Sequence, residues 1–335
     1  MRQCVGTPIN PLTISVALGF GCFGPFSYGW VGVHLFFFIS GYLIHYSFLR
    51  KPTQFNTPHF YWHRFWRIYP PYLLALLYMI FSRYKLGPIP AADWPMILNH
   101  FAMENISLNA SWWSLRIELE CYLVYPLVLL LRRWMNLKPI MLGATLMSIG
   151  ILLLFVNINN VPWQTPIYGR AMLWAEWMFG AYLAEFGVTQ RLGKVAWVGF
   201  GLTLTVLVLN AIGWLPFPSA QAYTLTIVLM AFLFAGMLAY KPADGWLNRR
   251  LSGLGLISYS FYLWHQPQIF KAISYLHTAG MPQNGVLDIF VGGIVIFIVI
   301  YALSWVLYKF IELPSVKIGE RLWHRLTAPQ QAASA

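Results

Sequence analysis

The chain has 335 residues, of which 59% are hydrophobic and only 10% are charged, whereas a soluble domain carries about 25% charged residues. This composition excludes an ordinary soluble protein and indicates a polytopic membrane protein. The net charge of +12 does not indicate nucleic-acid binding, because the basic residues fall between apolar runs rather than on a polar face. Cys4, Cys22 and Cys121 offer neither a disulfide framework nor the spacing of a metal site.

Apolar stretches long enough to cross a bilayer recur along the chain, since a spanning helix needs about 20 mostly apolar residues. They predict an all-α integral membrane helix bundle with about nine spans. Residues 12–27 are also apolar, but glycines and a proline interrupt them, so they are not counted. The predicted spans are residues 30–49, 65–83, 112–131, 139–156, 170–187, 195–213, 222–240, 256–276 and 287–308.

The basic residues predict the orientation of these spans, because Lys and Arg collect in the cytoplasmic loops of membrane proteins. Most of the 22 Lys and Arg residues follow odd-numbered spans, which places the C-terminus in the cytoplasm. An odd number of spans then places the N-terminus outside, and Met1–Asn10 carries no signal-peptide pattern to explain its export. We therefore expect an upstream helix, which would bring the total to about ten, with a true outside start as the alternative.

Ionisable residues lie inside the third predicted span, where Arg116, Glu118 and Glu120 share the segment from Trp112 to Tyr122. Each such residue costs about 2.5–3.5 kcal/mol on insertion, so intramembrane charges usually face a protein interior or a watery cavity and mark a functional site. The alternative is a structural ion pair, because Arg116 and Glu120 are four residues apart and share one helix face.

The first predicted span carries a histidine near its outer end and two small residues near its middle. His34 is a candidate for proton transfer, and the alternative is an interfacial or buried histidine that is satisfied by hydrogen bonds. Ser40 and Gly41 either contribute to a site or simply let a neighbouring helix backbone approach closely.

Two arginines stand at the cytoplasmic entrance of the second span. Arg64 and Arg67 are three residues apart on one helix face, and two guanidinium groups suit a phosphate-bearing ligand through bidentate hydrogen bonds. The alternative is anchoring to lipid headgroups. Pro70 and Pro71 follow directly and predict a kink or a delayed helix start.

The eighth predicted span places His265 beside Pro267. A proline removes a backbone hydrogen bond and leaves the carbonyl group near Leu263 without its helical partner. An intramembrane histidine next to such a kink is a candidate functional residue, with a packing role as the alternative. Glu312, at the end of the last span, is interpreted as a charge at a helix exit.

Taken together, these segments resemble the acyltransferase family 3 proteins, integral-membrane O-acyltransferases many of which modify bacterial surface polysaccharides. Each segment alone is a weak signal, and their order along a membrane protein makes the resemblance specific. His63 replaces the first arginine of the second pattern. The matches are residues 29–44 to GVDLFFVISGFLI, Arg64–Pro70 to RRFxRIYP, Trp113–Tyr122 to WSLSVEEQFY, Arg170 and Gly180 to RxxEFxxGxxxA, Ser258–Pro267 to SYSLYLWHxP, and Tyr308–Pro314 to YxxIExP.

The resemblance implies an acyltransferase of the bacterial inner membrane that transfers groups other than aminoacyl groups. Its expected reaction moves an acyl group, usually acetyl, from cytoplasmic acyl-CoA to a sugar hydroxyl of a surface or exported glycan. Acyl-CoA is then a co-substrate, no permanently bound cofactor or metal is expected, and the other partners are the glycan and membrane lipids. The implied catalytic residues are Glu118, His34, Arg116 and His265, the acyl-CoA-binding residues are Arg64, Arg67 and Tyr69, and the acceptor-binding residues are Trp113, Ser114, Ser40 and Arg170.

The chain also departs from the family pattern. The family's first helix carries an arginine and, about eleven residues later, a histidine regarded as central to catalysis, and residues 1–28 contain no histidine. The family aspartate of GVDLFF is replaced by His34. Three explanations stay open: the true start lies upstream, the gene is truncated, or His34 has taken over as the base.

The expected organisation is a poorly defined N-terminal segment at residues 1–28, a transmembrane acyltransferase domain at residues 29–314 and a cytoplasmic tail at residues 315–335. Two other functions remain as alternatives. A secondary transporter would also place ionisable residues at mid-membrane, although no internal repeat is visible. A catalytically inactive relative would serve as a membrane scaffold.

Overall fold

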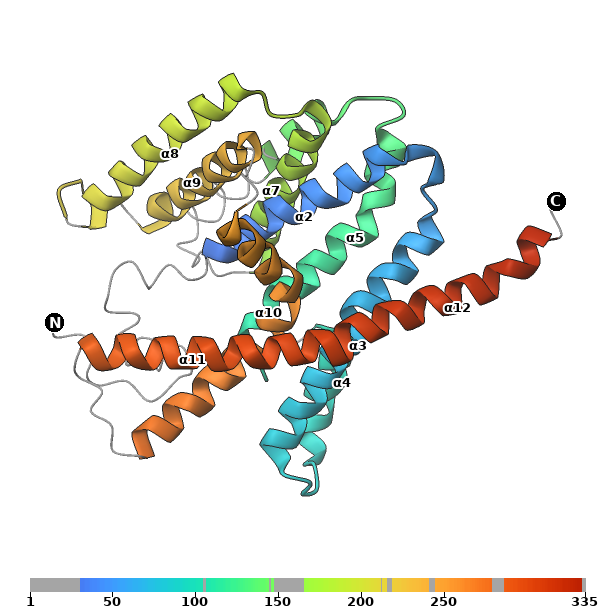
Figure 1. Cartoon of the computed structure of the whole chain (residues 1–335), viewed down its shortest axis with the longest axis vertical. Helices are drawn as coiled ribbons and strands as arrows, with labels where there is room; N and C mark the ends of the chain where they lie inside the picture. The colour runs from blue at the N-terminus through green and yellow to red at the C-terminus, as the bar shows by residue number, and fades with distance from the viewer. Residues whose placement is uncertain are drawn as a thin grey trace. The chain divides into compact units, whose positions relative to one another are not determined.

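The computed structural model of the chain describes residues 31–104, 107–144, 146–147, 166–211, 213–215, 219–240, 245–278 and 286–332 (Figure 1). The predicted N-terminal segment and most of the predicted span at 139–156 lie outside these ranges. All regular structure within them is helical, which confirms the predicted all-α class. The chain divides into two compact units, one formed by Met1–Phe55 and Ile117–Pro242 and the other by Asn56–Arg116 and Ala243–Ala335.

Each unit combines helices from distant parts of the sequence, and the boundary falls inside α5. The first unit contains α2 (Val31–Arg50), η2 (Pro52–Gln54), α5 (Trp113–Leu131) from Ile117 onward, α7 (Pro166–Phe186), α8 (Gln190–Ala211) and α9 (Ser219–Ala239). The second contains α3 (Thr57–Tyr84), η3 (Ala91–Asp93), α4 (Trp94–Phe101), η4 (Ala110–Trp112), α10 (Trp246–Thr278), α11 (Val286–Leu307), η5 (Tyr308–Glu312) and α12 (Leu313–Ala332).

Described helices coincide with all of the predicted spans except the one at 139–156. Among the described residues, three helical stretches are long and apolar enough to cross a membrane: Gly32–Arg50, Gln190–Asn210 and Gly292–Thr327. Helix α5 is not among them, because Arg116, Glu118 and Glu120 fall within it. The structure thus supports apolar membrane helices.

In the first unit, α2 and α7 run in the same direction and touch backbone to backbone. A Cβ atom added to Gly41 would overlap the carbonyl oxygen of Trp177, and one added to Gly180 would overlap the carbonyl oxygen of Phe38. Only glycine permits this approach at either position. The prediction that a small residue lets another backbone come close is therefore confirmed for Gly41.

Aromatic side chains fill the space beside this contact. The Phe38 ring stacks on Phe234 of α9 with a centroid separation of 6.0 Å, and it meets the edge of Phe179 of α7 at 5.7 Å. Helix α8 packs on α9 in the same unit, where Gly199 faces the ring of Phe232. The buried core of the unit thus joins α2, α7, α8 and α9.

In the second unit, α3 begins at Thr57 and continues through Pro70 and Pro71, so the predicted delayed start of the helix is wrong, and the alternative, a kink, stays a prediction. A proline at position 70 cannot donate to the carbonyl group of Trp66 four residues earlier. The Ser315 hydroxyl of α12 donates to that oxygen at 2.8 Å. The neighbouring helix therefore satisfies the acceptor that the proline leaves unpaired.

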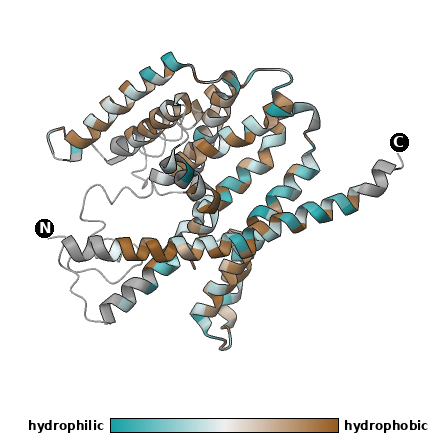
Figure 2. Ribbon diagram, viewed as in Figure 1, coloured by the Kyte–Doolittle hydropathy of each residue, from teal (hydrophilic) through white to brown (hydrophobic). Residues whose placement is uncertain are grey.

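Helices α11 and α12 follow one another directly through η5, a single π-helical turn. Figure 2 shows mainly hydrophobic residues along the coloured part of α11 and more hydrophilic residues along the coloured part of α12. Helix α12 packs on α3, where the Trp62 indole donates to the Gly319 carbonyl oxygen at 2.7 Å and Gly319 leaves room for the Trp66 ring.

We predict that alanine at Gly41 or Gly180 destabilises the protein by about 1–3 kcal/mol, because the added methyl group meets backbone that cannot give way. Thermal unfolding of the purified chain in detergent measures the change. The matched control is Gly201→Ala in α8, where an added Cβ meets nothing within 4 Å. Equal stability of Gly41→Ala and Gly201→Ala would contradict the close contact.

The second unit contains an acid-sensitive histidine outside the predicted spans. His100 is fully buried on α4, and its Nε2 accepts the Leu108 N–H at 3.2 Å. Burial lowers the pKa of His100 to about 4. Its pKa in the unfolded chain is about 6.5, so the unfolded chain binds the proton first as the pH falls.

We therefore expect the free energy of unfolding to fall as the pH drops from about 6.5 to about 4. Thermal unfolding at several pH values checks this. In His100→Gln, an amide oxygen that does not titrate can accept the same N–H, so the pH dependence should flatten. An unchanged slope in this variant would assign the acid sensitivity to other groups.

Candidate active site

The first unit buries an imidazole against a carboxylate. His34 lies in the first turn of α2 and Glu176 lies in the middle of α7, with exposed fractions of 1% and 2%. The distance from His34 Nδ1 to Glu176 Oε1 is 2.6 Å. Both helices are held together by the glycine contact, so the pair forms directly beside it.

The other oxygen of Glu176 has no such partner. Glu176 Oε2 is buried, and no hydrogen bond reaches it from the part of the chain that the structure describes. A buried carboxylate that is only partly satisfied is costly. Charged groups kept at such a cost are typical of functional sites.

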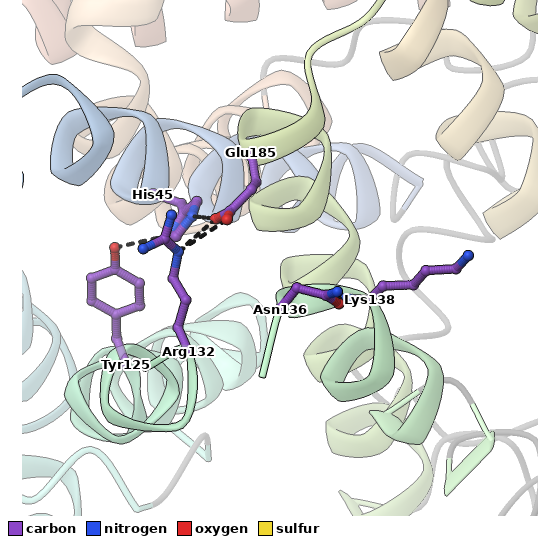
Figure 3. A network of polar contacts seen from close by, with 6 residues as sticks. All are labelled: His45, Tyr125, Arg132, Asn136, Lys138 and Glu185. Carbon is purple, nitrogen blue, oxygen red and sulfur yellow. Dashed lines mark hydrogen bonds and ion pairs between the residues drawn. The ribbon is translucent and has the colours of Figure 1, made fainter. Parts of the chain in front are cut away.

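A second polar cluster joins the C-terminal ends of the same helices (Figure 3). His45 of α2 is fully buried, and its Nε2 lies 2.7 Å from Glu185 Oε2 near the end of α7. Its Nδ1 lies 3.2 Å from the Tyr125 hydroxyl of α5. Arg132 donates through Nε to both Glu185 oxygens, at 2.8 and 3.1 Å. This cluster ties three helices together.

Figure 3 also shows Asn136 and Lys138, which make a separate local contact. The Lys138 backbone N–H donates to the Asn136 side-chain oxygen at 3.1 Å. The helical turn that follows residue 136 therefore begins with a side-chain cap.

Glu118, the predicted catalytic carboxylate, lies on α5 within the first unit and is 5% exposed. The Tyr122 hydroxyl, one helical turn later, donates a hydrogen bond to Glu118 Oε1. Ser40 of α2 is also buried, at 8% exposure. The first unit thus holds His34, Ser40 and Glu118 of the predicted site.

The start of α5 belongs to the second unit, where it meets α10. The Ser114 and Tyr262 hydroxyl oxygens are 2.7 Å apart, and the Trp112 indole donates to the Leu263 carbonyl oxygen at 3.3 Å. The carbonyl group predicted to lose its partner to Pro267 is therefore paired with a side chain. Trp113 lies between these contacts and is half-buried.

Arg116 and His265 also belong to the second unit. Arg116 forms an ion pair with Glu104 at 3.7 Å and remains about one-third exposed. The His265 Nδ1 donates to the Tyr262 carbonyl oxygen at 2.7 Å. Because that carbonyl only accepts, Nδ1 carries the hydrogen and Nε2 is the accepting nitrogen of the neutral ring.

The predicted acyl-CoA-binding residues share one stretch of α3. Arg64 lies over the Phe60 ring at 5.5 Å, and Arg67 is exposed. Burial lowers the pKa of His63, the charge of Arg64 lowers it further, and Glu320, whose carboxylate lies 3.5 Å from the ring, opposes the shift. The Tyr69 hydroxyl donates to the Phe101 carbonyl oxygen at 3.2 Å, which fixes α4 against α3.

Arg170 is the remaining predicted residue. It lies on α7, but its side chain is outside the described part of the structure. Glu312 was interpreted as a charge at a helix exit, and this is wrong, since it is 3% exposed within η5. Its Oε2 accepts the Ser260 hydroxyl of α10 at 2.7 Å.

Sequence reasoning missed Glu176, although a signal was present. The family pattern RxxEFxxGxxxA places its glutamate four residues before its glycine, and Glu176 lies four residues before Gly180. In that register the pattern's arginine falls on Leu173 rather than on Arg170. His45 and Glu185 were also missed, because neither stands out in a single sequence.

Comparison with known proteins supports the family resemblance of the sequence motifs. The family model of the acyltransferase domain, Acyl_transf_3, matches residues 6–308. The chain belongs to acyltransferase family 3. This membership accounts for both the order of the matching segments and the apolar helices, since the family is membrane-associated.

The named relatives that the chain matches carry the name O-acetyltransferase. O-acetyltransferase OatA of Staphylococcus aureus strain NCTC 8325 / PS 47 is 28% identical over 340 residues, covering 87% of this chain and 53% of the relative. A protein of strain MRSA252 provisionally named as an O-acetyltransferase is 24% identical over 349 residues, covering 90% and 55%. The chain spans about half the length of these relatives. No solved structure matches it.

Proposed function

We propose that the protein is a membrane O-acyltransferase that moves an acetyl group from acetyl-CoA to a sugar hydroxyl of a surface or exported glycan. The observation that carries this proposal is the match of the acyltransferase domain over residues 6–308. The names of the O-acetyltransferase relatives favour acetyl as the group that is moved. Buried carboxylates and imidazoles on apolar helices are consistent with catalysis within the membrane domain.

The donor binds from the cytoplasm at the start of α3. Arg64 and Arg67 hold the phosphates of CoA through charge-assisted hydrogen bonds. Tyr69 contributes by fixing this end of α3 against α4, and its contact with the Phe101 carbonyl oxygen supports this role.

The acceptor hydroxyl and the carbonyl group of the donor react within the helices. In the first unit, Glu118 orients a base or accepts the proton of the acceptor hydroxyl. In the second unit, Arg116 or His265 is suited to stabilising developing negative charge. The candidate acceptor-binding residues are Ser40 and Arg170 in the first unit and Trp113 and Ser114 in the second. Ser114 and Trp113 are well suited, because a hydroxyl group and an aromatic ring are common partners of a sugar.

In the membrane, the chain forms about nine spans. Its C-terminus and the tail from residue 315 lie in the cytoplasm of a bacterial inner membrane. The distribution of Lys and Arg and the helices that coincide with the predicted spans support this arrangement.

Glu118→Gln tests the catalytic assignment. We expect acetyl transfer to fall by about 10²–10⁴-fold, because the amide neither takes a proton nor carries charge. The measurement is transfer of labelled acetyl from acetyl-CoA to a glycan acceptor in membranes that contain the chain. Glu120→Gln, on the same helix, is the control. A loss equal in both variants would point to helix packing instead.

Arg64→Gln and Arg67→Gln test the donor site. We expect each to raise KM for acetyl-CoA by about 10-fold or more, because a hydrogen bond to a charged group contributes about 1.5–3 kcal/mol. KM for the acceptor should stay the same. Arg191→Gln, an exposed arginine of α8, is the control. An unchanged KM for acetyl-CoA in both test variants would place the donor elsewhere.

A further inference from the structure

Helix α10 carries a lysine within the eighth predicted span that the proposed reaction does not use. Arg249 lies close to the start of this helix, and basic residues mark the cytoplasmic end of a span. Lys271 lies about six turns further along the helix, so it lies toward the outer side. A charged residue inside a span is costly to insert and is by default a candidate functional residue.

The ammonium group of Lys271 is held by Tyr78 of α3, which contacts α10 in the second unit. Lys271 Nζ lies 4.5 Å from the centroid of the Tyr78 ring and donates to its hydroxyl oxygen. Gln268, one turn earlier on α10, donates through Nε2 to the same oxygen at 3.2 Å. The buried ring of Trp264 lies 4.7 Å from the Tyr78 ring, so the phenol is held in place.

Hydrogen-bond donors remain unused at this cluster. A phenol oxygen accepts two hydrogen bonds and donates one, and Lys271 and Gln268 supply the two that Tyr78 accepts. Within the described part of the chain, no acceptor meets the hydroxyl hydrogen of Tyr78 and no carboxylate pairs with Lys271. The ammonium group has three hydrogens, of which Tyr78 accepts one. The cluster therefore offers O–H and N–H donors together with a positive charge.

These donors suit an acidic ligand. Lys271 is exposed, and Tyr78 and Gln268 are half-buried. A lysine that only extends toward the membrane surface directs its ammonium group to water, whereas this one turns back over an aromatic ring. An ammonium group and neighbouring donors bind a carboxylate or a phosphate through charge-assisted hydrogen bonds.

The cluster shares α10 with a candidate acceptor-binding contact. The hydroxyl oxygens of Ser114 and Tyr262 are 2.7 Å apart, and Tyr262 precedes Lys271 by about 13 Å along the helix axis. An acceptor that contains several sugars is long enough to contact both places. The acidic group would then belong to a sugar other than the one that is acetylated.

We propose that Lys271, Tyr78 and Gln268 form a subsite for an acidic group of the acceptor glycan. The inference rests on the proposed function, because that function brings a glycan to the outer side. Lys271 supplies the charge, and the Tyr78 hydroxyl and the Gln268 amide donate to the oxygens of the carboxylate or phosphate. No covalent bond changes at this subsite. Its effect is to select acidic acceptors over neutral ones.

Binding tests the subsite without turnover. The probes are oligosaccharides released from the cell envelope of the encoding bacterium, end-labelled with a neutral fluorophore and separated by anion exchange into acidic and neutral pools. The full chain in phosphatidylcholine nanodiscs should bind the acidic pool about 10-fold more tightly than the neutral pool or better. Lys271→Gln should lose this preference and Lys271→Arg should keep it. Equal affinities in the wild type, or an unchanged preference in Lys271→Gln, would overturn the subsite.

Lys85→Gln is the matched control, because Lys85 is an exposed lysine that follows α3 in the same unit, and the preference should survive. Tyr78→Phe keeps the ring and removes the hydroxyl group, so binding of the acidic pool should weaken by about 3–10-fold. Unchanged binding in Tyr78→Phe would overturn the part assigned to the phenol. Thermal unfolding of each variant separates lost binding from a lost fold.

Anionic lipid headgroups present the same chemistry as an acidic sugar. Phosphatidylglycerol that copurifies with each variant is quantified by mass spectrometry. If Lys271→Gln retains less of this lipid while its glycan binding is unchanged, the occupant is a lipid and the proposal is overturned.

Kinetics distinguish this inference from the proposed function. Lys271→Gln should raise KM for acidic acceptors by about 10-fold, with KM for acetyl-CoA unchanged. If the wild type transfers acetyl groups and KM for acidic acceptors does not change in Lys271→Gln, the subsite is overturned while the proposed function stands. If the wild type transfers no acetyl group but Lys271→Gln loses the binding preference, the proposed function fails and the subsite stands.

Discussion

The close approach of α2 and α7 determines most of what the first unit can do. Gly41 and Gly180 let the two backbones touch, and small residues at helix contacts are how membrane helices associate without a hydrophobic driving force between them. Once the helices are this close, one polar pair forms on each side of the contact. His34 meets Glu176, and His45 meets Glu185.

In the second unit, hydrogen bonds between helices form at carbonyl groups that prolines leave unpaired within their own helix. The hydrocarbon region of a bilayer contains no water that could donate a hydrogen bond to an unpaired carbonyl group. In this unit, side chains of other helical segments donate to these carbonyl groups instead. Ser315 reaches the carbonyl of Trp66 behind Pro70, and Trp112 reaches that of Leu263 behind Pro267. The carbonyl groups that the prolines leave unpaired therefore become hydrogen-bonding sites between helices. These hydrogen bonds compensate for the one that Pro70 removes from α3, which remains continuous.

Buried acids divide into two kinds in this protein. Glu185 has Arg132 and His45 as partners and joins helix ends, so its role is explained by structure. Glu176 has His34 on one oxygen, and nothing in the described residues reaches the other. A carboxylate that is only half satisfied is costly to bury, so packing does not account for Glu176 as it does for Glu185.

The sequence by itself determined the class of protein, the helical segments and the family, because apolar length, charge placement and short motifs are local properties. It also identified His34 and Glu118 as candidates. Only the tertiary structure decided their partners. The meeting of His34 with Glu176 joins residues 142 positions apart, and no helical spacing rule reaches that far. Arg116 shows the same limit, since no spacing rule joins it to Glu104, with which it forms an ion pair.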